Sequence, residues 1–251
     1  PKIKLPIMID TARYLNGYDA ARDSEGYFFD PDRAQQAIDW IEAHCSHVKG
    51  SLGGQPFYLE LWQQAFIATL FGWYKVADGL RRYREVLLYI PRKNGKTPLA
   101  AAIALYVLDT DEEPGYEATA AAGDKIQAGK VYEWVSGMVR NDTGHLAKRY
   151  KSYKSPRHLV PYHDQASAFH IIAADADAQH GGNLHLVIVD ELHVQKNREL
   201  VDVLSTGTAA RDQPLFISLT TADTLREGSI CNEKLSYAKA VIAGTIKDPT
   251  F

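Results

Sequence analysis

The fold is decided by residues 86–97, VLLYIPRKNGKT. The apolar run at its start predicts a short buried strand, and the alanine-rich segment after Thr97 predicts a helix. A strand, a turn and a helix that opens with Gly-Lys-Thr are the usual context of a phosphate-binding loop, because the N–H groups and the dipole of a helix N-terminus attract phosphate. Lys96 is expected to reach the β- and γ-phosphates of a nucleotide, and Thr97 to ligate Mg²⁺.

A second predicted strand ends in two acidic residues. Residues 184–189, LHLVIV, predict a buried strand, and Asp190 and Glu191 follow it directly. Ligands of open α/β sheets bind at the carboxyl ends of the strands. Asp190 is expected to hold Mg²⁺ directly or through water, and Glu191 to polarise the attacking water as general base. Together with the phosphate loop, this strand end predicts a nucleotide hydrolase.

The whole chain fits one ordinary α/β protein. It has 251 residues, of which 45% are hydrophobic and 24% charged. Strand patterns that alternate with helix patterns predict a mostly parallel sheet with helices on both faces. The net charge of −3 excludes a protein that coats nucleic acid with its whole surface, and two cysteines exclude a disulfide framework. We expect a helical lead segment over residues 1–55 and a P-loop ATPase domain over 56–251.

Four segments resemble those of a known family, the large terminase subunits of tailed double-stranded-DNA bacteriophages. Those ATPases drive genome packaging into proheads. Residues 91–97, PRKNGKT, are similar to the family's Walker A loop, which typically lacks the first glycine and carries an arginine, here Arg92. Residues 62–64, WQQ, resemble its adenine-recognition segment, residues 181–193 its Walker B region, and residues 218–222, SLTTA, its coupling motif.

The resemblance implies a RecA-like P-loop NTPase fold with an additional strand, and ATP and Mg²⁺ as cofactors. Gln63 is the implied adenine reader, with Gln64 as the alternative. Arg92 is expected to clamp the γ-phosphate, and the hydroxyls of Thr220 and Thr221 to sense it. The predicted catalytic residues are Glu191, Arg92 and Lys96, and the predicted nucleotide-binding residues are Gln63, Pro91, Arg92, Lys93, Asn94, Gly95, Lys96, Thr97, Asp190, Thr220 and Thr221.

The resemblance also implies partners and a place in the cell. The partners are double-stranded DNA, the phage portal protein, a small terminase subunit and further copies of the chain in a homo-oligomeric ring on the portal. The expected location is the host cytoplasm, transiently docked on the prohead, with no membrane and no secretion. A C-terminal nuclease of RNase H-like fold is expected beyond residue 251.

Two sets of basic residues are candidates for contacts with other molecules. A ring ATPase often takes an arginine from the neighbouring subunit, and the candidates are Arg211 and Arg140. Residues 140–157 are basic with interleaved tyrosines, a composition that suits phosphate contacts without sequence readout. A solvated basic loop is the alternative. The candidate DNA contacts are Arg149, Lys151, Lys154 and Arg157.

Two other functions compete with a packaging motor. Residues 190–193, DELH, also fit the pattern of DExH-type nucleic-acid helicases. A helicase of that kind needs a second RecA-like domain, and about 60 residues after the acidic strand end are too few for one. A binding module without catalysis is the other alternative. Against it stand the intact catalytic and metal-binding candidates, Lys96, Thr97, Asp190 and Glu191.

Overall fold

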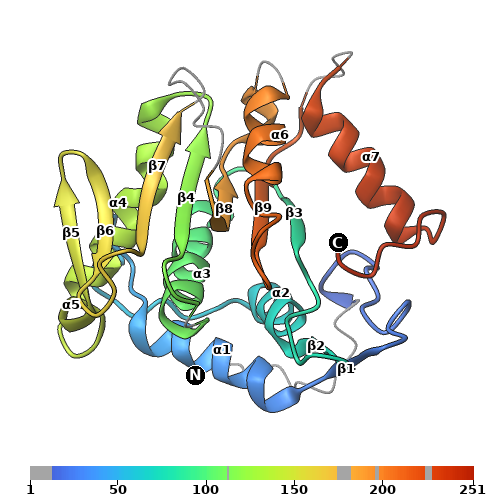
Figure 1. The fold of residues 1–251 in the computed structure, drawn as a ribbon, viewed down its shortest axis with the longest axis horizontal. Helices are drawn as coiled ribbons and strands as arrows, with labels where there is room; N and C mark the ends of the chain where they lie inside the picture. The colour runs from blue at the N-terminus through green and yellow to red at the C-terminus, as the bar shows by residue number, and fades with distance from the viewer. Residues whose placement is uncertain (1–12, 112, 174–181, 196–197, 224–227) are drawn as a thin grey trace.

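A seven-stranded sheet forms the centre of the molecule (Figure 1). The computed structural model describes residues 13–111, 113–173, 182–195, 198–223 and 228–251. The order of the strands across the sheet is β3-β9-β8-β4-β7-β6-β5. The strands are β3 (Glu85–Tyr89), β4 (Glu117–Ala122), β5 (Tyr150–Lys154), β6 (Arg157–Pro161), β7 (Ala168–Ala173), β8 (Leu184–Val189) and β9 (Leu215–Thr220).

Five of these strands run parallel. β3, β9, β8, β4 and β7 pair in parallel, so their carboxyl ends lie at the same edge of the sheet. β9 lies between the strand before the phosphate loop and the strand before the acidic pair, and Tyr89 is paired with Thr220. This order brings three predicted motifs to one edge, and it confirms the predicted mostly parallel sheet with an additional strand.

The far end of the sheet is antiparallel. β6 pairs antiparallel with β7, and β5 pairs antiparallel with β6. β5 occupies part of the basic stretch, which is therefore sheet as well as loop. A separate two-stranded antiparallel sheet joins β1 (Tyr27–Phe29) to β2 (Trp73–Lys75).

Helices cover both faces of the large sheet, as predicted. One core packs the first five helices against alternate residues of the strands, and a second core packs the last two against the opposite face. None of the described helices is long and apolar enough to cross a membrane. The helices are α1 (Pro31–His44), α2 (Leu61–Gly72), α3 (Lys96–Thr110), α4 (Lys125–Asn141), α5 (Leu146–Arg149), α6 (Glu199–Thr206) and α7 (Ile230–Ile242), with a 3₁₀ turn η2 (Leu192–Val194).

The lead segment shares the core of the ATPase region. α1 begins where Asp30 accepts hydrogen bonds from the N–H groups of Asp32 and Arg33, with Pro31 in the first turn. Its apolar stripe, which includes Ile38 and Ile41, belongs to the same buried cluster as α2 and α3. The domain boundary predicted near residue 55 stays a prediction. The shared cluster shows that α1 packs in the same helical layer as α3.

Candidate nucleotide site at the carboxyl edge of the sheet

The phosphate loop connects β3 to α3. Gly95 has φ of +72° and Lys93 has φ of +68°, so the chain turns sharply before α3 begins at Lys96. The Asn94 side chain closes the turn by donating to the carbonyl oxygens of Pro91 (3.2 Å) and Arg92 (3.4 Å). No side chain caps the N-terminus of α3. Its first N–H groups are therefore available to an anion.

Lys96 is buried inside this loop. The residue is 7% exposed, and Nζ donates to the carbonyl oxygens of Ile90 (3.2 Å) and Pro91 (3.4 Å). Burial lowers the pKa of Lys96, although the carboxylates of Glu191 and Asp190 act in the opposite direction. The ammonium group thus donates to neutral carbonyl oxygens. A bound phosphate would offer it negatively charged acceptors, which make stronger hydrogen bonds.

Asp190 and Glu191 form an acidic pair next to the loop. Asp190 is 2% exposed; its Oδ1 accepts from the N–H of Glu191 (2.9 Å) and its Oδ2 from Thr97 Oγ1 (3.4 Å). Burial and the charge of Glu191 raise the pKa of Asp190 to about 6. Glu191 has φ of +53°, a rare conformation for a residue with a side chain. The pair therefore holds negative charge that a cation would stabilise.

Gln63 lies against the phosphate loop from α2. Its Oε1 accepts from the N–H of Glu60 (2.9 Å), which closes the first turn of the helix. Its Nε2 lies so near the loop that a Cβ on Gly95 would stand 3.6 Å away. Gln64, the alternative reader, is buried and donates to the carbonyl of Leu59. The geometry therefore favours Gln63 over Gln64 as the glutamine beside a nucleotide.

The two threonines at the end of β9 are buried at the same edge. Thr220 Oγ1 donates to the carbonyl of Thr221 (3.0 Å) and accepts from the N–H of His193 (3.2 Å). Thr220 therefore contacts the turn that follows Glu191. Gly181, which belongs to the predicted Walker B region, lies outside the described residues.

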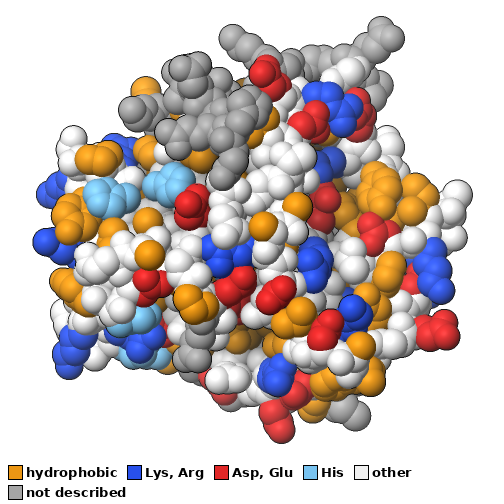
Figure 2. Space-filling model, in the orientation of Figure 1, with side chains coloured by type: hydrophobic (Ala, Val, Ile, Leu, Met, Phe, Trp, Pro, Cys, Tyr) orange, Lys and Arg blue, Asp and Glu red, His pale blue; other side chains and the backbone are white. Residues whose placement is uncertain are grey.

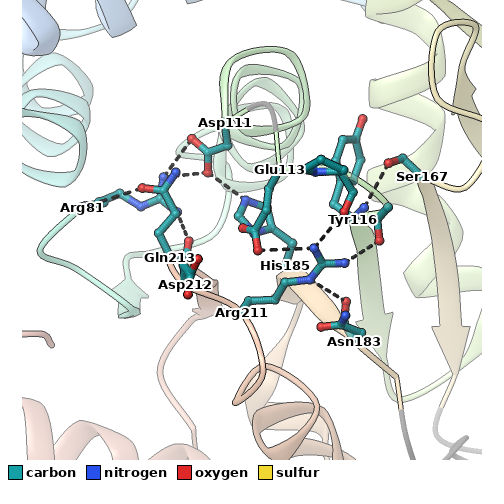
Figure 3. Close-up of polar contacts among 12 residues, drawn as sticks. Arg81, Asp111, Glu113, Tyr116, Ser167, Asn183, His185, Arg211, Asp212 and Gln213 are labelled. Carbon is teal, nitrogen blue, oxygen red and sulfur yellow. Dashed lines mark hydrogen bonds and ion pairs between the residues drawn. The ribbon is translucent and has the colours of Figure 1, made fainter. Parts of the chain in front are cut away.

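Arg211 does not lie at an accessible surface, and its prediction as an arginine for a neighbouring subunit is wrong. The residue is 8% exposed and lies before β9, at the amino edge of the sheet (Figure 3). Its guanidinium donates to the carbonyls of Asn183 (3.2 Å) and Pro114 (3.1 Å) and contacts Glu113 (3.3 Å). A group held by several partners in its own chain cannot extend into another.

Arg140, the other candidate, stays a prediction. It is exposed in the last turn of α4, where it donates to Ser136 Oγ (2.6 Å). The first turn of α4 follows the end of β4 at the carboxyl edge, so Arg140 lies about 24 Å along the helix from that edge. It could therefore serve only a site on another molecule.

The four candidate DNA contacts divide into two kinds. Arg149 pairs with the buried carboxylate of Asp109 (Nε to Oδ1, 2.7 Å) while 39% of its side chain stays exposed, so a DNA contact there stays a prediction. Lys151 and Lys154 are exposed on β5. Arg157, on β6, lies 3.8 Å from Glu133 of α4 and is partly exposed.

The sequence analysis missed two buried polar features. Gln195 is 4% exposed, and its Nε2 has no hydrogen-bond partner among the described residues although it lies beside Gly123 at the end of β4. No pattern in the sequence signals this position. At the amino edge, His185 lies between the carboxylates of Asp111 and Glu113. The signal there was available, because a histidine interrupts the apolar run of β8.

The phosphate loop after β3 and the acidic end of β8 lie at the same edge of the sheet, with the additional strand β9 between them. This arrangement defines a P-loop nucleotide hydrolase of RecA-like fold. Comparison with known proteins gives the family. The model of the terminase large subunit, ATPase domain, matches residues 61–240, and the chain belongs to that family. It is accordingly an ATPase domain. Nothing in the comparisons supports the helicase interpretation.

Individual relatives agree with this assignment. The chain is 27% identical over 194 residues to the terminase large subunit of Enterobacteria phage HK97, and 25% identical over 214 residues to that of Lactococcus phage p2. These matches cover 75% and 80% of this chain but only 36% and 38% of the relatives. The crystal structure of the HK97 large terminase has the same fold, with a TM-score of 0.69 and 24% identity over 86% of this chain and 42% of that one.

Proposed function

We propose that this chain is the Mg²⁺-dependent, ATP-hydrolysing motor of a viral DNA-packaging terminase, which moves double-stranded DNA into a prohead. One observation carries the proposal. The phosphate loop and the acidic pair meet at the carboxyl edge, where Thr97 Oγ1 and Asp190 Oδ2 are 3.4 Å apart. This contact supports a metal–nucleotide site there, because the chain belongs to the terminase ATPase family.

The residues fit Mg²⁺. Thr97 and Asp190 offer a hydroxyl and a carboxylate, the oxygen donors that Mg²⁺ prefers. Among the described residues, no three His, Cys, Asp or Glu side chains are arranged to hold a metal. Mg²⁺ is usually held by one or two carboxylates together with water and substrate phosphates, so this sparse set suits it. When bound, the ion would neutralise phosphate charge during cleavage.

The other residues have distinct proposed tasks. Lys96 would exchange its carbonyl partners for the β- and γ-phosphates, and Glu191 would orient water and accept its proton. Arg92 is exposed on the loop and is proposed to clamp the γ-phosphate. Gln63 would contact adenine, and Thr220 with its neighbour would sense the γ-phosphate. Pro91, Lys93, Asn94 and Gly95 would shape the loop around the phosphates.

An ATPase assay with and without Mg²⁺ and double-stranded DNA tests the proposal. Hydrolysis should require Mg²⁺, and Lys96→Ala should reduce turnover by roughly 100-fold or more, since it removes a phosphate-stabilising charge. Lys75→Ala, at an exposed lysine on β2, is the matched control and should retain activity. Full activity in Lys96→Ala, or activity without a divalent cation, would overturn the assignment of this site.

The DNA contact is proposed for the groove between α4 and the β5–β6 hairpin. Its lining includes four basic side chains, Lys49, Lys130, Lys154 and Arg157, and one carboxylate, Glu133. Figure 2 shows lysine, arginine and histidine side chains gathered along the edge where β5 and β6 lie. Such an excess of positive charge favours phosphate contacts that do not read sequence.

Salt-dependent DNA binding tests that surface. The double variant Lys130→Ala and Lys154→Ala should weaken duplex binding and reduce the slope of log affinity against log salt by about 2, because two phosphate contacts are lost. Lys75→Ala with Lys247→Ala removes the same charge from exposed lysines elsewhere. Equal effects of the two double variants would show that the groove is not the contact surface.

The remaining partners are proposed from the resemblance alone. They are the portal protein, the small terminase subunit and neighbouring copies in a ring, with a nuclease in a further domain of the longer protein. The proposed location is the host cytoplasm, with docking on the prohead during packaging. The curated relatives span more than twice the length matched here, so these assignments concern the whole protein.

A further inference from the structure

The turn after the acidic pair brings a histidine back onto Glu191. η2 begins directly after Glu191, and the left-handed conformation of that residue reverses the chain there. His193 Nδ1 lies 3.2 Å from Glu191 Oε2 and 3.3 Å from Thr220 Oγ1. The side chain of His193 is 13% exposed and that of Glu191 is 26% exposed. One imidazole nitrogen thus faces both the proposed general base and the end of β9.

The hydrogen-bond partners assign the proton on that nitrogen. Glu191 Oε2 lies 3.2 Å from His193 Nδ1, within ion-pair distance, but it has no hydrogen-bond partner among the described residues, so Thr220 and not Glu191 indicates where the proton lies. Thr220 Oγ1 already donates to the Thr221 carbonyl at 3.0 Å, and it accepts from the main-chain N–H of His193. Because its hydrogen is used there, Thr220 Oγ1 can only accept in its 3.3 Å contact with His193 Nδ1, which requires a hydrogen on Nδ1. That N–H also lies beside the Glu191 carboxylate.

We propose that His193 is a positioning residue, which holds the Glu191 carboxylate in its productive orientation and links it to the end of β9. The inference rests on the proposed role of Glu191 as general base. A base must lie within hydrogen-bond reach of the water it activates, and a displacement of about 1 Å can cost roughly 100-fold in rate. The contact removes the rotamer freedom that would allow such a displacement.

The link continues beyond β9 into α7. Thr220 Oγ1 lies 3.4 Å from Sγ of Cys231, in the first turn of that helix. Glu191, His193, Thr220 and Cys231 therefore form one continuous line of contacts. A shift of β9 or α7 would move the base, which is a physical route by which the threonine end of β9 can influence hydrolysis.

Isosteric substitutions distinguish this role from general packing. The side-chain nitrogen of asparagine occupies the place of histidine Nδ1, whereas that of glutamine occupies the place of Nε2. We expect His193→Ala and His193→Gln to lower kcat for ATP by roughly 10- to 100-fold with little change in KM, and His193→Asn to restore most of kcat. His163→Ala, at an exposed histidine beside β6, is the matched control and should be unchanged.

Two further measurements make the result decisive. Because His193 acts through Glu191, adding His193→Ala to Glu191→Gln should cost less than about 2-fold, and additive losses would overturn the inference. Nitrogen-15 NMR of the nucleotide-free protein should find the Nδ1–H tautomer at His193 and a shift of that signal in Glu191→Gln. The NMR measurement does not depend on ATP turnover. If neither the tautomer nor the shift is found, the contact is refuted even in a protein without ATPase activity. If both are found in an inactive protein, the proposed function is refuted instead.

Discussion

The two edges of the central sheet bury similar charged residues in opposite ways. At the amino edge, both oxygens of Asp111 accept from Arg81 (3.1 and 2.9 Å), and one also contacts His185 (2.8 Å). His185 reaches Glu113 at 2.7 Å with its other nitrogen, and Glu113 pairs with Arg211 (Figure 3). Each of these charges has an opposite charge beside it within the chain.

At the carboxyl edge the pairing is incomplete. Lys96 donates to carbonyls and not to a carboxylate, and Asp190 receives only a hydroxyl and an N–H group. The two aspartates show the difference. Burial would raise the pKa of Asp111, but Arg81 and His185 bring it below its usual value, whereas burial and Glu191 raise the pKa of Asp190. Complete pairing indicates a structural role, and incomplete pairing indicates a site completed by a ligand.

The largest effect is expected from Glu191→Gln at the carboxyl edge. Removing the general base should lower kcat by roughly 10²- to 10⁴-fold, while nucleotide still binds and the free energy of unfolding changes by about 0.5 kcal/mol or less. Steady-state kinetics, nucleotide titration and urea denaturation measure the three quantities. Full turnover in this variant would show that another group is the base.

Arg211→Ala should have its effect on stability instead. It leaves the Glu113 carboxylate without its arginine, which for a buried pair costs about 3–5 kcal/mol, while kcat per folded molecule stays unchanged. Urea denaturation together with the ATPase rate of the folded fraction measures this. Arg198→Ala, in an exposed ion pair, is the control and should barely move the transition. A stable Arg211→Ala variant that lost ATPase activity would restore the arginine to a catalytic role.

Asp190→Asn should stabilise the nucleotide-free, metal-free protein. The folded-state pKa of about 6 is above the unfolded value, so the carboxyl contributes its full stability below pH 4 and loses it as the pH rises through 6. At pH 8 the variant should be more stable by roughly 1–3 kcal/mol, and the advantage should shrink toward pH 5. Denaturation in EDTA across this range measures it. A less stable variant at pH 8 would mean that the charge is already compensated within the chain.

The smallest effect is expected from Ser218→Ala. Ser218 lies on β9 between the two edges, fully buried, and its hydroxyl has no hydrogen-bond partner in the part of the chain that the structure describes. Removing it should stabilise the protein by about 1 kcal/mol or less and change kcat by less than 2-fold. A large loss of ATPase activity would show that the Ser218 hydroxyl takes part in the reaction. The nucleotide site would then extend beyond the carboxyl edge of the sheet.

Local patterns were enough to predict the nucleotide site. The strand, glycine turn and helix of residues 86–97 and the acidic end of β8 each depend on neighbours in the chain, so their form could be foreseen. The alternation of strands and helices likewise predicted a mostly parallel sheet. The resemblance carried by these motifs predicted the family, which comparison then confirmed.

The partners of long charged side chains could not be predicted in this way. Arginine is usually a surface residue, yet Arg211 and Arg149 each pair with an acidic residue far away in the sequence. His193 contacts Thr220 only because β9 lies beside β8 and presents Thr220 to the turn after Glu191.

The sequence by itself determined the phosphate loop, the acidic pair and the class of sheet, because hydrophobic periodicity and turn chemistry act over a few residues. Only the tertiary structure decided which charged side chains are paired with an opposite charge within the chain and which need a ligand. That distinction depends on packing between segments as distant as residues 81 and 213, and it separates the structural edge of the sheet from the edge that we propose hydrolyses ATP.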